Sequence, residues 1–391
     1  MTGIVILSGA RTAIGSFGGA LAATPPIALG ATVSRAAIAR AGIEPGAVGQ
    51  VVFGHVINTE PRDMYLSRAA AMEAGVPETV PAMNVNRLCG SGVQAIVSVV
   101  QALELGDADF GLAGGAESMS RSPFILPTAR WGQKMGDTPA QDMMLGALNC
   151  PFGTGHMGVT AENVADEHGV TRAAQDAFAL ESQARAARAI AEGRFAAQIV
   201  PVEVKGRRET IAFDTDEHPK ATTAEALAGL RPAFRKDGTV TAGNASGLND
   251  GAGALVLARA DAAQAHGLKP GFRVRGYAHA GVRPEVMGIG PVPAVRRLLE
   301  RTGLAVGDFD VIESNEAFAA QAIAVSRELG LPDDKVNPNG GAIALGHPVG
   351  ATGAIITIKA MYELDRIGGS LALVTMCIGG GQGIALAIER I

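Results

Sequence analysis

One arrangement of residues occurs twice in the sequence, once near each end. Residues 84–100 read NVNRLCGSGVQAIVSVV, and residues 337–359 read NPNGGAIALGHPVGATGAIITIK. Each copy has an Asn-x-Asn pair, a glycine-rich turn with one reactive side chain, and then an apolar stretch at helical spacing. A tandem duplication of about 120 residues explains both copies and places Cys89 opposite His347. Chance similarity between two glycine-rich turns is the alternative.

Short apolar runs alternate with longer amphipathic runs in both end regions. Up to residue 118, strand-like runs such as GIVILSG and DFGLAGGAES are separated by helix-like ones, and the alternation returns from residue 268, with a further strand expected at residues 335–340. This alternation predicts crossover units in largely parallel sheets covered by helices on both faces. We therefore expect two α/β halves, at residues 1–118 and 268–391, with the stretch at 247–267 completing the first.

Residues 119–246, between the two halves, have a different character. They contain loop-like stretches rich in proline and glycine, one clear amphipathic helix (TRAAQDAFALESQARAARAIAEGRF) and a charged segment. Inserted segments of this kind often cover an active site. We expect an inserted loop domain over the active site; an oligomerisation arm is the alternative.

Composition excludes several classes of protein. The net charge of -5, without long runs of like charge, argues against a nucleic-acid partner. Charged residues interrupt the apolar runs before they reach the roughly 20 residues that span a bilayer, and no secretory leader is evident. Three cysteines do not make a disulfide framework. We expect a cytoplasmic protein without a membrane partner.

Cys89 stands where a strand is expected to pass into a helix. Free N–H groups and the dipole at a helix N-terminus favour a thiolate over a thiol, and the thiolate is the reactive form. Gly90 and Gly92 would let a ligand approach the backbone closely. We therefore predict a reactive thiolate. Because free cysteines are commonly buried, a small core residue is the alternative.

Three further glycine-rich or strand-end segments carry reactive side chains: Asn315 and Glu316 in ESNEAFAAQ, His347 in GHPVG, and Cys377 in CIGGGQG. Strand ends of an α/β sheet gather at one edge, so these side chains can converge on Cys89. A thiol nucleophile needs a base and N–H donors for an oxyanion, and a second thiol can itself move a proton. Alone, each has a structural explanation, as helix cap, turn or core residue. A zinc site is disfavoured because close cysteine pairs are missing.

Seven motifs together resemble one enzyme family. NRLCGSG, GGAESMS, HMGVTAENVA, GNASGLNDGAGA, NEAFAAQ, GGAIALGHPVGATGA and CIGGGQG resemble, in order and across essentially the whole chain, the thiolases, which are acetyl-CoA C-acyltransferases. The resemblance implies a thiolase-like α/β fold, with two duplicated halves in a layered αβαβα arrangement and an inserted loop domain. It also implies coenzyme A thioesters as substrates and no cofactor or metal.

The resemblance assigns a role to each reactive residue. Cys89 would take an acyl group from acyl-CoA, and His347 would activate Cys89. His347, with a water molecule held by Asn315, would also form the oxyanion hole for the second thioester. Cys377 would remove the α-proton of that thioester. The N–H groups of Cys89 and Gly379 would hold the oxyanion of the acyl-enzyme.

The resemblance further implies contacts to coenzyme A. Residues expected to contact the pantetheine arm or line its tunnel are Leu148, His156, Met157, Phe234, Ser246, Ala317 and Phe318. The chain departs from the family at EHPKATT, where an Arg-His pair is common near the nucleotide. Lys220 is the residue we expect there instead.

The motifs GNASGLND and CIGGGQG are similar to those of biosynthetic thiolases, whereas TEPRDMYLSRAAA and ARWGQKMGD are similar to those of broader-chain β-ketothiolases. We expect acetyl-CoA acetyltransferase activity with some tolerance of longer 3-ketoacyl chains. The alternatives are a broad-chain or degradative thiolase, a β-ketoacyl synthase and a non-catalytic acyl-CoA-binding protein. The resemblance also implies a homotetramer built as a dimer of dimers, with residues 119–140 as the tetramer contact.

Overall fold

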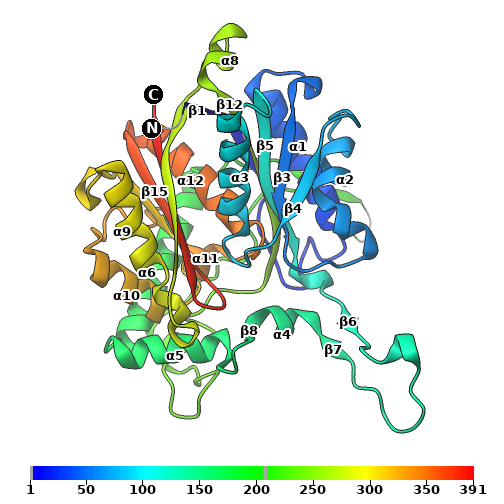
Figure 1. Cartoon of the computed structure of the whole chain (residues 1–391). Helices are drawn as coiled ribbons and strands as arrows, with labels where there is room; N and C mark the ends of the chain where they lie inside the picture. Colours follow the sequence, from blue (N-terminus) through cyan, green and yellow to red (C-terminus); the bar gives the residue numbers. More distant parts are fainter. Residues whose placement is uncertain (1–2, 207–208) are drawn as a thin grey trace.

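The computed structural model describes residues 3–206 and 209–391, so residues 1–2 of the expected first half and 207–208 of the expected insertion lie outside the described part. Within that part, ten strands form one continuous sheet (Figure 1). Strands of the first half are β1 (Ile4–Arg11), β2 (Gly15–Ser16), β3 (Gln50–Gly54), β4 (Ala82–Val85), β5 (Phe110–Ser118) and β12 (Asn249–Arg259). Strands of the second half are β13 (Phe272–Gly281), β14 (Val311–Ser314), β15 (Leu371–Ile378) and β16 (Gln382–Arg390).

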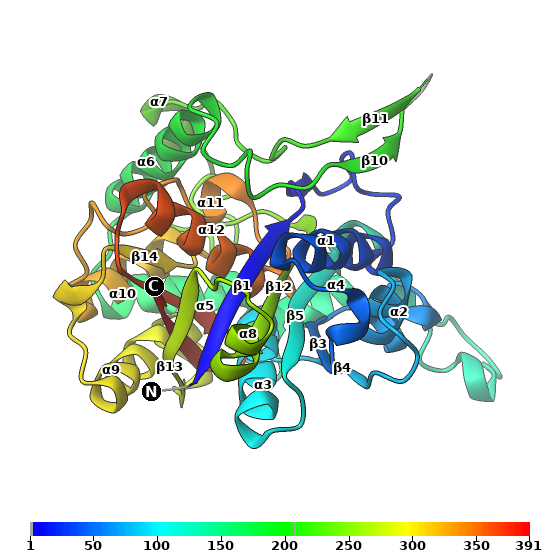
Figure 2. The same ribbon diagram turned by 90° about the horizontal axis from the view of Figure 1, so that it is seen from above.

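The strand order repeats in mirror image about the middle of the sheet. The first half runs β4-β3-β5-β12-β1, and the second runs β13-β16-β15-β14 away from the junction. The halves meet where β1 pairs with β13 through two residue pairs, Val5 with Arg273 and Ile6 with Phe272. Seen from above, β1 lies centrally, with β13 on one side and β12 on the other (Figure 2). The predicted duplication of two α/β halves is confirmed.

The prediction of largely parallel sheets is wrong. Three ladders are parallel: β3 with β4, β3 with β5, and β14 with β15. The ladders that join β1 to β12 and β13, β12 to β5, and β16 to β13 and β15 are antiparallel. The turn at residues 379–381 between β15 and β16 is too short for a crossover, so that pair must be antiparallel. The strand expected at 335–340 is reduced to a single bridge between Val336 and Ile312, because Pro338 cannot donate to a ladder.

Helices of the two halves form three layers, and the two halves of the sheet form the two layers between them. The helices are α1 (Pro26–Ala41), α2 (Leu66–Glu73), α3 (Ser91–Leu105), α8 (Ala260–Ala265), α9 (Pro291–Thr302), α10 (Ala319–Leu329), α11 (Ala342–Leu345) and α12 (Thr352–Ile367). α1 and α2 cover the outer face of the first half, and α9, with α10 beside it, covers that of the second. α3 and α12 pack together between the halves, in a core that includes Ile96, Val100, Ile358 and Leu364. The predicted αβαβα layering is confirmed.

Residues between β5 and β12 carry elements of their own. These are β6 (Phe124–Ile125), β7 (Gln141–Asp142), α4 (Met143–Leu148), β8 (Asn149–Cys150), β9 (Gly155–His156), α5 (Met157–Glu167), α6 (Arg172–Ala191), β10 (Val202–Lys205), β11 (Thr210–Phe213) and α7 (Ala224–Ala228). The β6–β7 ribbon extends away from the rest of the chain (Figure 1). β12, which follows this segment, lies between β1 and β5 in the first half.

α3 and α12 cross at two glycines that occupy matching places in the repeat. A Cβ atom on Gly92 would lie 2.5 Å from the backbone nitrogen of Ala354, and one on Gly353 would meet the backbone nitrogen of Val93. Only a residue without a side chain allows the two backbones to approach this closely. Residues 88–105, which include α3, are long and apolar enough to cross a membrane. A helix buried in a protein core, as α3 is, meets the same two criteria. The crossing places the turns before both helices next to each other.

We predict that Gly92→Ala lowers the free energy of unfolding by about 1–3 kcal/mol, because the added methyl group forces the two helices apart. Urea denaturation followed by circular dichroism measures the change. Gly146→Ala in α4 is the matched control, since a Cβ atom there meets nothing within 4 Å. Equal stability of the two variants would show that the crossing tolerates a side chain.

Candidate active site

Cys89 lines a small cavity of about 60 Å³, which we call the thiol cavity. Segments from both halves and from the insertion meet there. Its lining residues are Val56, Leu88, Cys89, Met119, Ala147, Leu148, Met157, Ser246, Met287, Ala317, Phe318, His347, Val349 and Gly379. The convergence depends on tertiary structure, since these residues are spread over most of the chain.

The structure brings most of the expected site residues to this cavity and leaves a few outside its lining. Those that line it are Cys89, His347, Gly379, Leu148, Met157, Ser246, Ala317 and Phe318. Cys377 is buried in one apolar cluster with Met157 and Phe318, while Asn315 follows β14 directly. His156 stacks on Phe234 with ring centroids 4.7 Å apart, and the rings of Phe234 and Phe318 pack in a T-shaped arrangement. Lys220 does not line the cavity; its backbone N–H donates to Gln183.

Cys89 sits in a tight turn between β4 and α3, as the sequence predicts. The turn is closed by Ser91, whose Oγ accepts the N–H of Arg87 at 2.8 Å and donates to the carbonyl of Leu88 at 2.6 Å. Leu88 has a φ of 45°, a left-handed backbone that a branched side chain rarely adopts. Strain of this kind persists at functional sites when surrounding contacts impose it. Here it aims the next side chain, Cys89, into the cavity.

The expected thiolate at Cys89 is not what the geometry favours. Burial raises the pKa of Cys89 to about 11, although the backbone N–H groups of Gly379 and of Cys89 itself oppose the rise. The negative charge of Glu117 raises this pKa further. Desolvation of the sulfur therefore outweighs the helix N-terminus, and Cys89 is a thiol at neutral pH.

His347 lines the thiol cavity, and one of its two ring nitrogens is held by a hydrogen bond. Its Nδ1 lies 2.6 Å from Oγ1 of Thr352, which donates its own hydrogen to the carbonyl of Pro348. Nδ1 must therefore carry the proton, and Nε2 keeps its lone pair. Nε2 has no hydrogen-bond partner within the described part of the chain. Burial lowers the pKa of His347 to about 4, so the ring is neutral at pH 7.

Cys377 and Asn315 add a second set of buried polar groups. Burial raises the pKa of Cys377, and the neighbouring Cys89 raises it further, so Cys377 is also a thiol in the free protein. The side-chain amide of Asn315 is buried, and neither its oxygen nor its nitrogen has a partner among residues 3–206 and 209–391. Unpaired buried polar atoms are rare in proteins and point to a polar ligand.

Two positioning residues of His347 were missed from the sequence. Asn249 accepts the backbone N–H of His347 at 2.9 Å, and Thr352 holds its ring. Both belong to motifs that the sequence shows, GNASGLND and GHPVGATG, but nothing in a motif says which loop its side chains will meet.

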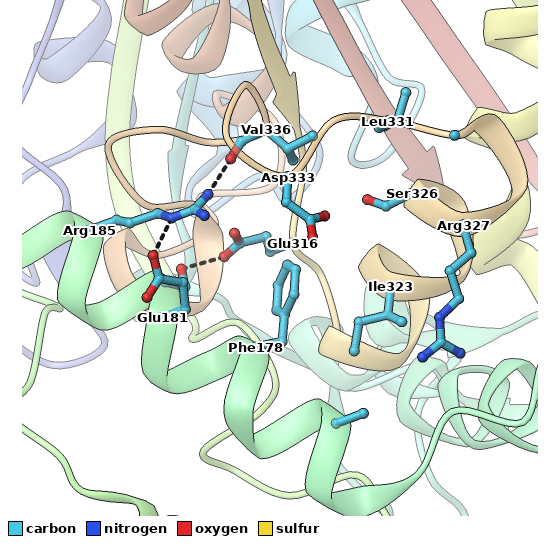
Figure 3. A pocket seen from close by; sticks show the side chains of 13 residues that line it. Phe178, Glu181, Arg185, Glu316, Ile323, Ser326, Arg327, Leu331, Asp333 and Val336 are labelled. Carbon is cyan, nitrogen blue, oxygen red and sulfur yellow. Dashed lines mark hydrogen bonds and ion pairs between the residues drawn. The ribbon is translucent and has the colours of Figure 1, made fainter.

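A larger cavity of about 530 Å³ lies between α6, α10 and the loop at residues 330–336 (Figure 3). None of the expected catalytic residues lines it, so the smaller thiol cavity is the better candidate on chemical grounds. Glu316 lines the larger cavity. It accepts hydrogen bonds from Ser182 at 2.7 Å, Asn337 at 2.9 Å and the N–H of Ile343 at 3.2 Å. Glu316 therefore ties α6 to the segments that carry Asn315 and His347.

Comparison with known proteins gives a consistent result over the whole chain. Residues 4–261 match the model of the thiolase N-terminal domain, and residues 268–390 match that of the thiolase C-terminal domain. A beta-ketothiolase BktB of Cupriavidus necator is 60% identical over 99% of both chains, and an acetyl-CoA acetyltransferase of Escherichia coli is 51% identical over 100% of both. The crystal structure of the acetyl-CoA acetyltransferase of Bacillus anthracis is similar with a TM-score of 0.98 at 46% identity, covering 100% of this chain and 99% of that one. Human mitochondrial 3-ketoacyl-CoA thiolase in complex with CoA has a TM-score of 0.96 at 42% identity, with 99% and 98% covered.

We predict that alkylation of Cys89 by iodoacetamide in the free protein accelerates about tenfold per pH unit from pH 7 to 10, because only the thiolate reacts. This follows from the pKa of about 11. Peptide mass mapping separates Cys89 from the buried Cys150 and Cys377. A rate that levels off below pH 8 would show that the pKa of Cys89 is low, so that the helix N-terminus affects this pKa more than burial does.

Proposed function

The chain belongs to the thiolase family, and we propose that acyl groups pass through its thiol cavity, carried by Cys89. The enzyme is an acyltransferase that condenses two acyl-CoA thioesters reversibly to a 3-ketoacyl-CoA and CoA. One observation carries the assignment of roles: the thiol of Cys89 and the neutral imidazole of His347, whose Nε2 has no partner among the described residues, line one cavity, and the second buried thiol, Cys377, packs in one cluster with Met157 of its wall.

The first half-reaction loads Cys89. Nε2 of His347 takes the proton of Cys89, and the sulfur attacks the carbonyl carbon of the acyl-CoA. The carbonyl electron pair moves onto oxygen, which the N–H groups of Cys89 and Gly379 stabilise. When the tetrahedral species collapses, the bond from carbon to the coenzyme A sulfur breaks, and Cys377 gives that sulfur a proton. The products are acyl-Cys89, CoA, an imidazolium at His347 and a thiolate at Cys377.

The second half-reaction neutralises both the imidazolium of His347 and the thiolate of Cys377. The Cys377 thiolate takes the α-proton of the second thioester, and the resulting carbanion attacks the carbonyl carbon of acyl-Cys89. The carbon–sulfur bond to Cys89 breaks, and His347 returns its proton to that sulfur. All three groups are then neutral again. The high pKa of Cys377 suits both roles, because a weakly acidic thiol is protonated at rest and is strongly basic once ionised.

The enolate oxygen of the second thioester needs hydrogen-bond donors. We assign this task to His347 and to a water molecule held by Asn315. The amide of Asn315 and Nε2 of His347 support the assignment, since both are buried and neither has a hydrogen-bond partner among the residues that the structure describes.

We place the pantetheine arm along Ser246, Met157 and the aromatic residues beside them. The N–H of Ser246 donates to the carbonyl of Ala317 at 3.0 Å, which ties the two segments that line this part of the cavity. The ring of His156 is fixed because its Nδ1 accepts the N–H of Gly158 at 3.0 Å. The nucleotide contact at Lys220 stays a proposal. The position of His218 supports it: the positive charge of Lys220 contributes to lowering the pKa of His218, and the His218 ring packs on Gly247, next to Ser246.

The small volume of the thiol cavity favours short acyl groups. We therefore propose acetyl-CoA acetyltransferase activity with limited tolerance of longer chains. A broad-chain β-ketothiolase is the second candidate, and the 60% identity to the beta-ketothiolase of Cupriavidus necator favours it. Neither proposal needs a cofactor or a metal.

We propose a cytoplasmic homotetramer. The exposed apolar side chains of the 119–140 segment support the tetramer contact, since patches of this kind mark interfaces. They are Phe124, Ile125, Leu126, Trp131 and Met135. Three free cysteines fit a reducing compartment.

CoA-dependent thiolysis of acetoacetyl-CoA, 3-ketohexanoyl-CoA and a longer homologue tests the function. We expect acetoacetyl-CoA to be the best substrate, and Cys89→Ala to abolish turnover of all of them. Comparable rates on the longer chains would establish the broad-chain candidate. Turnover that survives in Cys89→Ala would remove Cys89 from the mechanism.

Cys377→Ala tests the proton-transfer role separately. The variant should still form acyl-Cys89, although more slowly, because Cys89 and His347 are intact. It should lose exchange of the α-protons of acetyl-CoA with solvent. Intact-protein mass spectrometry measures the first property and proton NMR in deuterated water the second. Exchange at the wild-type rate would contradict the assignment of Cys377 as the base.

A further inference from the structure

Glu117, at the end of β5, belongs to the motif GGAESMS and takes no part in the steps above. Its carboxylate is fully buried. Burial raises the pKa of Glu117, and contacts with N–H groups and with His55 oppose the rise. A buried carboxyl group is costly unless hydrogen bonds compensate, so its partners indicate what it holds.

Those partners come from two segments far apart in the sequence. A single oxygen, Oε2, accepts the N–H of Val56 at 3.1 Å and the N–H of Gly350 at 2.9 Å. The other oxygen, Oε1, accepts the N–H of Ile57 at 3.2 Å. Glu117 thus joins the segment after β3 to the segment between His347 and α12.

Both segments also form the wall of the thiol cavity. Val56, whose own N–H is held by Glu117, lines the cavity, and so does Val349, which directly precedes Gly350. The distance between these two valines therefore depends on a carboxylate that does not line the cavity. His347 lies in the second segment, three residues before Gly350.

Close backbone packing makes this link stiff. A Cβ atom on Gly350 would lie 2.5 Å from Oε2 of Glu117 and 3.0 Å from Cα of His55. A Cβ atom on Gly54 would lie 2.6 Å from the carbonyl oxygen of Gly350. The segments have no free space in which to move closer together, so a change at the shared acceptor can only move them apart.

We propose that Glu117 is a positioning residue that sets the separation of Val56 and Val349 and so limits the length of the acyl chain that Cys89 accepts. The inference rests on the proposed function, because it concerns acyl transfer to Cys89. A carboxylate suits this task better than an amide, since it presents acceptors alone to three N–H groups.

A competition experiment on the full-length protein tests the inference. Wild type and Glu117→Gln are each mixed with equal concentrations of acetyl-CoA and hexanoyl-CoA, and intact-protein mass spectrometry gives the ratio of hexanoyl to acetyl groups on Cys89. The amide of Gln turns an N–H donor toward one of the backbone N–H groups, which releases a segment and widens the cavity. We expect the ratio to rise about tenfold, the usual scale of discrimination by a small change in an apolar pocket.

Asp310→Asn is the matched control. Oδ2 of Asp310 also accepts two backbone N–H groups, those of Ser370 at 2.7 Å and Leu371 at 3.2 Å, but none of these residues lines the thiol cavity. Loss of this acceptor should leave the acyl ratio at the wild-type value. A ratio that rises equally in the control would show general loosening of the fold and would overturn the inference.

Glu117→Asp covers the case in which Glu117→Gln does not fold. It keeps the charge but is one methylene shorter, so it cannot reach both segments, and we expect a raised ratio here too. Circular dichroism shows whether each variant folds. A folded variant with the wild-type ratio would overturn the inference, because Glu117 would then have only a structural role. Failure of both variants to fold would overturn it as well. Wild type that forms no acyl-Cys89 at all would instead overturn the proposed function, and this inference with it.

Discussion

The site depends on the close crossing of α3 and α12 at Gly92 and Gly353. Each helix follows a turn with one reactive residue, so the crossing brings Cys89 and His347 to one cavity. Any side chain at either glycine would separate the helices and, with them, the two reactive groups. The duplicated architecture therefore has a structural consequence: each half supplies one of two candidate reactive residues, Cys89 and His347, to the same cavity.

Desolvation decides the charge state of that pair. Removing water from the sulfur of Cys89 and the ring of His347 raises one pKa and lowers the other, so the free protein holds a neutral thiol beside a neutral base. The backbone N–H groups of Cys89 and Gly379 point at the same sulfur and oppose the rise of its pKa. Buried carboxylates such as Glu117 and Glu316 hold the surrounding loops by accepting backbone N–H groups, which keeps these loops in register without adding a cation to the site.

Much of the local structure could be predicted from the sequence. The run FRVRGYAHAG coincides with β13, and the helical spacing after Cys89 coincides with α3. The direction of the strands was not predictable in the same way, because alternation of strands and helices does not show where β12 and β16 insert into the sheet. The low pKa expected for Cys89 was wrong for a related reason: the helix that follows is visible in the sequence, but the apolar groups that exclude water are not.

The sequence by itself determined the reactive residue types, the turns that hold them and the family to which they belong. The tertiary structure alone decided which turns meet, that Thr352 engages Nδ1 of His347, and that a single oxygen of Glu117 joins two segments of one cavity wall. Secondary structure follows from patterns within a few neighbouring residues. Proximity and desolvation, in contrast, arise from packing between segments that are hundreds of residues apart, and no local pattern records them.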